Sequence, residues 1–400
     1  MPVANAQYTL PPDQLALAIR YSHALYWLHF LGAFLAIAVL IAILATGLAG
    51  KLRDWAERVS RRRLIQTALF VPALLLVNDV LNLPIGITAQ TVEVKFNQSI
   101  ESWPAWLWDW AKAELITAVV ATVLATILYV IIRRSPRRWW LYFWLAGLPL
   151  LAGAMVVEPY LIEPLFYKFE PLAVKHPALV QDMEKLVARA GLEIPPERMF
   201  EMQASDKVNS LNAYVSGFGA SKRIVVWDTT IAKLTRPEIL SVFGHELGHY
   251  VLGHIRDGMI AGALFTLLLL YAGFHAIHGM LRRWGTGWGV REAGDLASAP
   301  ALLLLFTIFS FLSEPIVNGY SRRQEHQADM YGIEILHDMV PDDRAVTIHG
   351  FQVMGEISLD EPDPNPFIVF WAFTHPTTSD RIRFTATYDP WSHGTARYVK

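Results

Sequence analysis

Six stretches of the chain are long and apolar enough to cross a membrane as helices. Five contain no Asp, Glu, Lys or Arg and the sixth contains only Asp79; they cover residues 21–50, 64–92, 115–132, 139–157, 258–281 and 296–313. About 20 apolar residues in a helix span the roughly 30 Å hydrocarbon core of a bilayer. The alternative, helices buried in a large soluble core, would rarely produce six such stretches. The pattern predicts a mainly α-helical integral membrane protein with about six transmembrane helices.

The order of these stretches predicts two regions. Residues 1–163 are expected to form an N-terminal membrane region with four helices, and residues 164–400 a second region interrupted by helices at 258–281 and 296–318. The first stretch has no basic start and is too long for a cleavable signal, so we expect it to be retained as a span. The polar blocks before and after the last two helices must then meet on one face of the membrane.

The first polar block mixes helix and strand. Apolar residues at helical spacing predict an amphipathic helix over 178–190. Runs rich in branched and aromatic residues predict short strands at 198–202, 212–215 and 223–227. Gly217 and Gly219 lie between the last two strands and predict a hairpin turn. This block is therefore expected to be a small α+β domain.

Composition limits the chemistry. Lys and Arg number 34 against 36 Asp and Glu, so the chain has no basic excess of the kind that nucleic acid binding needs. The chain has no cysteine, which excludes disulfides, thiolate nucleophiles and cysteine-ligated metals. Any metal must be held by His and carboxylate side chains.

One segment has the spacing of a zinc site. Thr235 and Glu238 match a capping box, so a helix is expected from Arg236 to His254. Within it, His245 and His249 are four residues apart and lie on one helical face, where both imidazoles can bind one Zn²⁺. Glu246 stands beside them and can take a proton from water. This short motif alone is equally compatible with a histidine pair that has only a structural role.

A third ligand is expected because a catalytic zinc usually has three protein ligands. Glu325 and Asp329, after the last span, share a helical face, so Glu325 can ligate while Asp329 accepts a hydrogen bond from a ligating histidine. His326 is a weaker candidate because it lies off that face. Taken alone, the pair also fits an exposed acidic face balanced by Arg322 and Arg323.

Together, these motifs resemble the membrane zinc metallopeptidases of the CAAX prenyl protease type 1 family. The likeness runs from about residue 64 to 383. It rests on His245-Glu-x-x-His249, on Ser321-Arg-x-x-Glu325-x-x-x-Asp329, on the segments 159–169, 212–217 and 222–229, and on Thr374-His375-Pro376 followed by Arg381. The resemblance implies a metallopeptidase domain of the gluzincin type, built from the two polar blocks.

The resemblance also implies individual roles. One Zn²⁺ per chain would be held by His245, His249 and Glu325, with Glu246 as the general base and with Asp329 and Arg322 beside the ligands. His375 and Arg381 would lie near the substrate and the developing oxyanion. Asn212, Ala213 and Tyr214 would form an edge strand that pairs with a peptide.

The implied function is hydrolysis of extended or membrane-associated peptides, including prenylated CAAX-type C-termini. A second protease reading, the HtpX-like quality-control type, fits less well because four spans precede the zinc helix where that type has two. A zinc-binding transporter or receptor is a further alternative, but the repeated halves of a transporter are not evident. The natural substrate and the oligomeric state stay open.

Two features depart from the family. Its eukaryotic members resemble a seven-helix ring around an intramembrane chamber, whereas six spans are predicted here, so any chamber would be open or smaller. The family's Glu-rich loop before the third span is reduced here to residues 92–97.

The loops also predict an orientation. One side carries only Arg20 and Lys95, and the other carries thirteen basic residues: Lys51, Arg53, Arg58, Arg61, Arg62, Arg63, Arg133, Arg134, Arg137, Arg138, Arg282, Arg283 and Arg291. The positive-inside rule makes the basic side cytoplasmic and the catalytic face extracytoplasmic, opposite to the cytosolic catalytic face of the family's eukaryotic members. A reporter fused after Lys400 should therefore behave as extracytoplasmic, and cytoplasmic behaviour would contradict the loop-charge argument.

Overall fold

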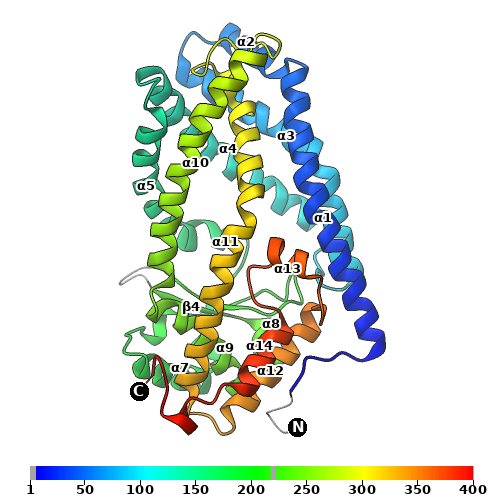
Figure 1. Ribbon diagram of the computed structural model, residues 1–400, viewed down its shortest axis with the longest axis vertical. Helices are drawn as coiled ribbons and strands as arrows, with labels where there is room; N and C mark the ends of the chain where they lie inside the picture. The colour runs from blue at the N-terminus through cyan, green and yellow to red at the C-terminus, as the bar shows by residue number, and fades with distance from the viewer. Residues whose placement is uncertain (1–5, 218–221, 400) are drawn as a thin grey trace.

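The computed structural model describes residues 6–217 and 222–399 of the chain. Six helices among them are long and apolar enough to cross a membrane, which confirms the predicted membrane fold. They are α1 (Pro12–Ala45), α3 (Arg63–Lys95), α4 (Trp103–Arg134), α5 (Trp139–Val157), α10 (His254–Trp284) and α11 (Ala299–Leu336). They form a tall layer, and a small sheet with shorter helices lies at one end of it (Figure 1). The predicted division into two regions at residue 163 remains a prediction.

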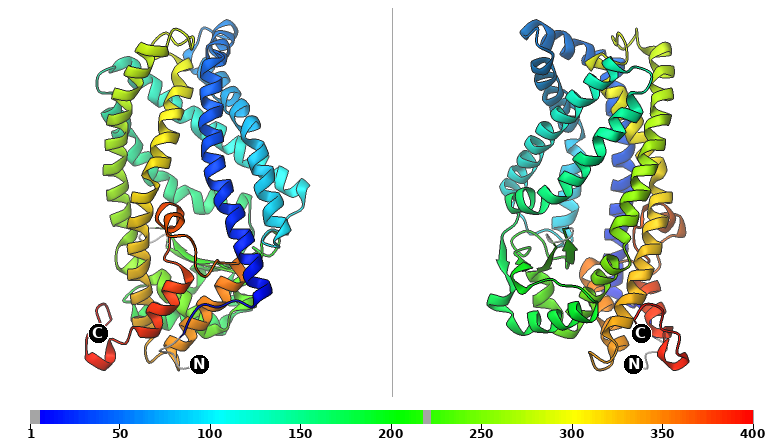
Figure 2. Two further views of the ribbon diagram at one scale, coloured as in Figure 1. Left: turned by 45° about the vertical axis from the view of Figure 1, so that its right-hand side comes forward. Right: turned by 90° about the vertical axis from the view of Figure 1, so that its left-hand side faces the viewer.

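The first span is shorter at its C-terminal end than the apolar pattern predicted. The stretch 21–50 is one helix only as far as Ala45, where α1 ends. Gly47 adopts φ 63°, a left-handed conformation that glycine accepts readily, and the chain turns there into the amphipathic helix α2 (Leu48–Val59). Figure 2 shows α2 at the end of the molecule opposite the sheet.

The sheet has four strands in the order β1 (Phe169–Pro171), β2 (Met199–Met202), β4 (Arg223–Trp227) and β3 (Ala213–Ser216). β2 and β4 are parallel, and the outer strands pair antiparallel with them. The three predicted strands are present, whereas β1 was missed because three residues ending in proline carry no strand pattern. β3 lies at an edge of the sheet. Gly217 follows β3 with φ 87°, and Gly219 lies outside the described residues.

Shorter helices complete the polar domain. They are α6 (Leu172–Lys175), α7 (Pro177–Arg189), α8 (Asp228–Lys233), α9 (Arg236–Val251), α12 (Asp343–Ser358), α13 (Pro366–Ala372) and α14 (Thr378–Thr387). The predicted amphipathic helix is α7, and it buries Leu179, Met183 and Leu186. These side chains join a core with residues of α9, the sheet and the end of α11. The two polar blocks therefore form one domain core, as the sequence required.

Helix α9 begins as predicted and ends earlier. The capping box is present: the Thr235 side chain accepts from the Glu238 backbone, and the Glu238 carboxylate accepts from the Thr235 N–H at 2.6 Å. The helix stops at Val251 instead of continuing to His254. Gly253 has φ 74° and starts a new helix, α10, in another direction. The zinc motif thus occupies the last two turns of α9.

Helix α11 continues through the end of the sixth span without a break. It is 38 residues long and carries Glu325 and Asp329 in its buried C-terminal part. The sequence predicted a separate polar block after residue 318, but the same helix extends into it. The membrane helix therefore holds these two carboxylates in a fixed orientation.

Helices α9 and α11 approach each other closely where small residues face one another. A Cβ added at Gly248 would lie 3.1 Å from the Cα of Ala328, and one at Gly332 would lie 3.0 Å from the backbone nitrogen of His245. Gly244 and Gly248 on α9, and Ala328 and Gly332 on α11, are each four residues apart and so lie on one helical face. Small residues in this spacing let two helix backbones come together.

Replacing Gly332 by alanine should therefore force the two helices apart. We expect Gly332→Ala to destabilise the protein by about 1–3 kcal/mol, because the new methyl group meets the backbone of His245 and not a movable side chain. Thermal unfolding of the full chain in detergent measures the change. Gly258→Ala is the matched control, since a methyl group there meets nothing within 4 Å. Equal melting temperatures for the two variants would contradict the close packing.

Candidate metal centre

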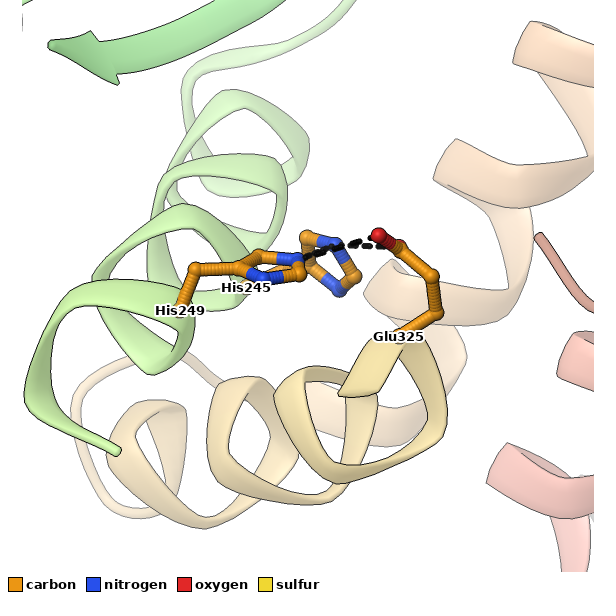
Figure 3. A group of neighbouring side chains, drawn as sticks. All are labelled: His245, His249 and Glu325. Carbon is orange, nitrogen blue, oxygen red and sulfur yellow. Dashed lines mark hydrogen bonds and ion pairs between the residues drawn. The ribbon is translucent and has the colours of Figure 1, made fainter. Parts of the chain in front are cut away.

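Three side chains converge where α9 faces α11. The Nε2 atoms of His245 and His249 lie 3.2 Å apart, and each lies close to the Glu325 carboxylate, at 3.2 and 3.3 Å. Figure 3 shows both imidazoles reaching from α9 toward the carboxylate on α11. One donor atom from each residue falls within 4.8 Å of the others. Two imidazoles and a carboxylate in this arrangement form a donor set that suits zinc.

Asp329 holds one of the two imidazoles in place. Its Oδ1 lies 2.7 Å from Nδ1 of His245, one turn of α11 beyond Glu325. Arg381, on α14, donates to both oxygens of Asp329, at 2.6 and 3.0 Å. A carboxylate in this position fixes the histidine tautomer and leaves Nε2 free to bind a metal.

The second imidazole has a partner that the sequence analysis missed. Nδ1 of His254 lies 3.1 Å from Nδ1 of His249, and its Nε2 lies 3.2 Å from Oε1 of Gln327. His254 was expected at the end of a longer helix, but the turn at Gly253 brings it back toward the site. In the sequence, only Gly253, directly before His254, indicated that the chain could turn at this point.

His375 reaches the cluster from the C-terminal segment. Its Nε2 lies 3.3 Å from Oε2 of Glu325, and its Nδ1 lies 2.8 Å from the Thr374 hydroxyl. Arg322 takes a different place from the one expected. Its guanidinium donates to the carbonyls of Val369 and Phe373, at 2.9 and 2.5 Å, and among the described residues it makes no hydrogen bond or ion pair with the three candidate ligands. It therefore anchors the segment that carries His375.

His326 is not part of the cluster. It lies on α11 next to Glu325, and its ring packs edge-on against Phe384 with the centroids 4.3 Å apart. Its neighbour Glu325 contacts His245 and His249 instead, so the two adjacent side chains face different groups.

Glu246 lies between two cavities that meet at the cluster. The larger, of about 510 Å³, is lined by His245, Glu246, His375 and Arg381, and the smaller, of about 370 Å³, also contains His249 and Glu325. Burial raises the pKa of the Glu246 carboxyl, and the Glu325 carboxylate acts in the same direction. A carboxylate with a raised pKa that faces open space is suited to exchange protons with a bound molecule.

The cluster fits a cation. Oε2 of Glu325 is buried and has no hydrogen-bond partner among the described residues. Burial lowers the pKa of the His245 imidazole, but the Asp329 carboxylate outweighs burial and raises that pKa to about 9. Both observations mean that positive charge is stabilised between these side chains. A divalent ion held by His245, His249 and Glu325 would supply that charge.

Only some main-chain groups of the predicted edge strand are free to bind a ligand in the larger cavity. Asn212 uses its N–H for the Thr230 hydroxyl, at 2.8 Å, and its carbonyl for the Trp227 N–H, at 3.1 Å. Because main-chain groups alternate along an antiparallel strand, Ala213 and Val215 point theirs to the free edge. Tyr214 instead donates its hydroxyl to Glu163, at 2.9 Å. The free edge of β3 is thus provided by Ala213 and Val215.

Comparisons with known proteins agree with this arrangement. The model of peptidase family M48 matches residues 174–388, and the model described as CAAX prenyl protease N-terminal, five membrane helices, matches residues 2–168. An uncharacterized metalloprotease of Bacillus subtilis, YhfN, is 34% identical over 94% of this chain and 86% of its own. CAAX prenyl protease 1 of Saccharomyces cerevisiae is 25% identical over 79% of this chain and 71% of its own.

A solved structure shows the same fold. The crystal structure of S. mikatae Ste24p superposes with a TM-score of 0.79 and covers 96% of this chain and 92% of its own, at 22% sequence identity. This likeness extends over the membrane helices as well as the polar domain, so the fold found here is shared along almost the whole chain.

Removing the Asp329 carboxylate should weaken metal binding. We expect Asp329→Asn to lower the affinity for a divalent ion by about 10–100-fold, because His245 loses the group that orients it. Titration against a competing chelator measures this affinity. Asp363→Asn removes the same charge from an exposed position and serves as the control. If the two variants bind metal equally well, Asp329 does not orient a ligand.

Proposed function

The chain belongs to peptidase family M48 and is a membrane metallopeptidase of the CAAX prenyl protease type, and from that premise we propose that it is a zinc-dependent endopeptidase. One Zn²⁺ per chain would be held by His245, His249 and Glu325. The observation that carries this proposal is the convergence of these three side chains within 4.8 Å, with Glu246 beside them at the junction of two cavities. Membership of a peptidase family favours an enzyme over a zinc-binding transporter or receptor.

The protein's own residues divide the chemical work. A zinc ion held by these ligands would supply a Lewis acid for the scissile carbonyl and for a water molecule. Glu246 takes the proton from that water, and the same carboxyl then gives the proton to the leaving amine. Asp329 keeps His245 in the tautomer that leaves Nε2 unprotonated.

His375 is placed to stabilise the charge that develops on the carbonyl oxygen. It lines both cavities, and its Nε2 is on the same side of the cluster as Oε2 of Glu325. A hydrogen-bond donor at this point stabilises the transition state more than the ground state. Arg381 also lines the larger cavity, but it donates two of its nitrogens to Asp329. We therefore assign Arg381 mainly to holding Asp329.

The larger cavity fits an extended peptide close to the membrane. The free edge of β3 offers main-chain groups of Ala213 and Val215, which can pair with a substrate strand whatever its side chains. Tyr21 and Tyr26 of the first span line the same cavity. A substrate bound here would contact both the polar domain and a membrane helix. Membrane-protein tails and lipid-bearing C-termini meet this requirement, and relatives named CAAX prenyl protease make a prenylated C-terminal peptide the first to test.

We also propose that this catalytic face lies outside the cytoplasm, and the charges of the short loops support this orientation. The basic loops all lie at the α2 end of the helical layer, away from the cluster.

Glu246→Gln should abolish cleavage without removing zinc. A loss of about 10²–10⁴-fold in the rate is expected, because the amide cannot accept the proton from water. Zinc content and hydrolysis of a quenched, unstructured peptide in detergent would be measured on the same preparations. Glu184→Gln, at an exposed position of α7, is the control and should behave as wild type.

The same assay tests the edge strand and the ligands. N-methylation of the substrate amide that pairs with β3 should lower kcat/KM by up to about tenfold, which is the net value of one hydrogen bond. Methylation at a distant amide should have no effect.

Equal cleavage by wild type and Glu246→Gln would remove the base from the mechanism, and absence of zinc from both would overturn the ligand assignment.

A further inference from the structure

A second group of cavities lies at the opposite end of the helical layer from the metal centre. Three connecting segments meet there: the α2 region after α1, the turn between α4 and α5, and the loop between α10 and α11. Figure 1 shows α2 and the neighbouring ends of α3 and α10 at this end of the molecule. Between them is a cavity of about 580 Å³, and a second cavity of about 280 Å³ shares part of its wall.

The larger of these cavities is positively charged. Four arginines from four different segments line it: Arg63, Arg133, Arg282 and Arg291. Glu292 is the one acidic residue in this lining. Such an excess of one sign around a single cavity creates an attractive site for anions.

Two of the four guanidinium groups are already used. Arg291 donates to both oxygens of Glu57, at 2.8 and 3.0 Å, so most of its charge is balanced. Arg133 donates to the carbonyl of Gly294, at 3.2 Å, and faces no carboxylate in any ion pair of the described residues. Glu292 lies close enough for its negative charge to act on Arg133, so this charge is offset in part, although the two side chains form no ion pair among the described residues.

The other two guanidinium groups are free. Within residues 6–217 and 222–399, the side chains of Arg63 and Arg282 make no hydrogen bond and no ion pair. Arg63 lies close enough for its positive charge to act on Arg133. Both side chains are exposed, so their guanidinium groups are open to an anion that enters the cavity.

The position of the cavity fits the polar surface of a bilayer. Arg63 is in the first turn of α3, Arg133 in the last turn of α4 and Arg282 in the last turn of α10. All three helices are candidate spans, so these turns lie at the depth where lipid headgroups are found. Ile132 and Leu281 add apolar surface to the same wall. Basic pockets between the ends of membrane helices bind the headgroups of anionic lipids.

We propose that Arg63, Arg133 and Arg282 form a binding site for a phosphate group, and that its position favours the headgroup of an anionic phospholipid over free phosphate. The guanidinium groups provide several N–H donors in a fixed geometry that matches phosphate oxygens. The site lies at the other end of the membrane helices from the metal centre. It does not depend on the proposed peptidase mechanism.

The test compares two double variants of the full chain. Arg63→Gln/Arg282→Gln removes the two unpaired guanidinium groups of the cavity, and because they have no partners the fold should be retained. Arg61→Gln/Arg283→Gln removes the same charge from exposed neighbours that line neither cavity. Delipidated protein in detergent would be titrated with phosphatidylglycerol and with phosphatidylcholine, and lipid adducts would be counted by native mass spectrometry.

Wild type should prefer phosphatidylglycerol, and the cavity variant should lose about 25-fold in affinity for it, at roughly fivefold per arginine. The control variant should keep most of the preference. Equal binding of the two lipids by wild type, or equal losses in both variants, would overturn the proposal. Melting temperatures without lipid verify the fold, and peptide cleavage by each variant separates this site from the metal centre.

Inorganic phosphate distinguishes the two sources of the anion. If millimolar phosphate displaces phosphatidylglycerol from wild type, the site recognises the phosphate group itself. If the lipid stays bound, the apolar wall contributes and a phospholipid is the ligand. If neither anion binds, the arginine cavity is not a phosphate site.

Discussion

The close approach of α9 and α11 determines the geometry of the metal centre. Two helix backbones that pack on ordinary side chains lie about 8–10 Å apart, and the short reach of a glutamate and two imidazoles requires the lower end of that range. Gly248 packs against the backbone of Ala328 and Gly332 against the backbone of His245, so His245 and His249 face Glu325 directly. Asp329 then lies one turn further along α11, where it contacts Nδ1 of His245. The positions of the ligands and of Asp329, which orients His245, therefore follow from this one contact between α9 and α11.

This dependence explains how much the sequence could predict. Spacings of four residues identified both histidines, the base and the two carboxylates, because each spacing is a property of one helix. The glycines had a spacing of four as well, but nothing in a single sequence says which two helices will pack through them. His254 was missed for a related reason, since its position depends on the turn at Gly253. Likewise, six spans were recognisable from hydropathy, whereas the unbroken course of α11 past residue 318 was not.

The C-terminal segment adds groups that no local pattern could place. His375 and Arg381 come from beyond the last span and reach the cluster because the segment is tied down at several points. Arg322 donates to two of its carbonyls, and Trp371 donates to Glu314 at 2.8 Å. The resemblance to a family suggested that they lie near the site, and it also suggested Arg322 beside the ligands, whereas Arg322 binds main-chain carbonyls. An arginine can hold a site together by binding main chain as effectively as by binding a ligand.

Charge balance shows why this arrangement calls for a metal ion. Glu325 and Asp329 are 7% and 3% exposed, and an uncompensated buried carboxylate is costly. Arg381 compensates Asp329, whereas Glu325 faces only imidazoles, and one of its oxygens has no hydrogen-bond partner among the described residues. The raised pKa of His245 shows that positive charge beside Glu325 is stabilised, and a bound cation would supply that charge in place of the proton. A divalent ion bound there would lower the free energy of the folded chain as well as provide its chemistry.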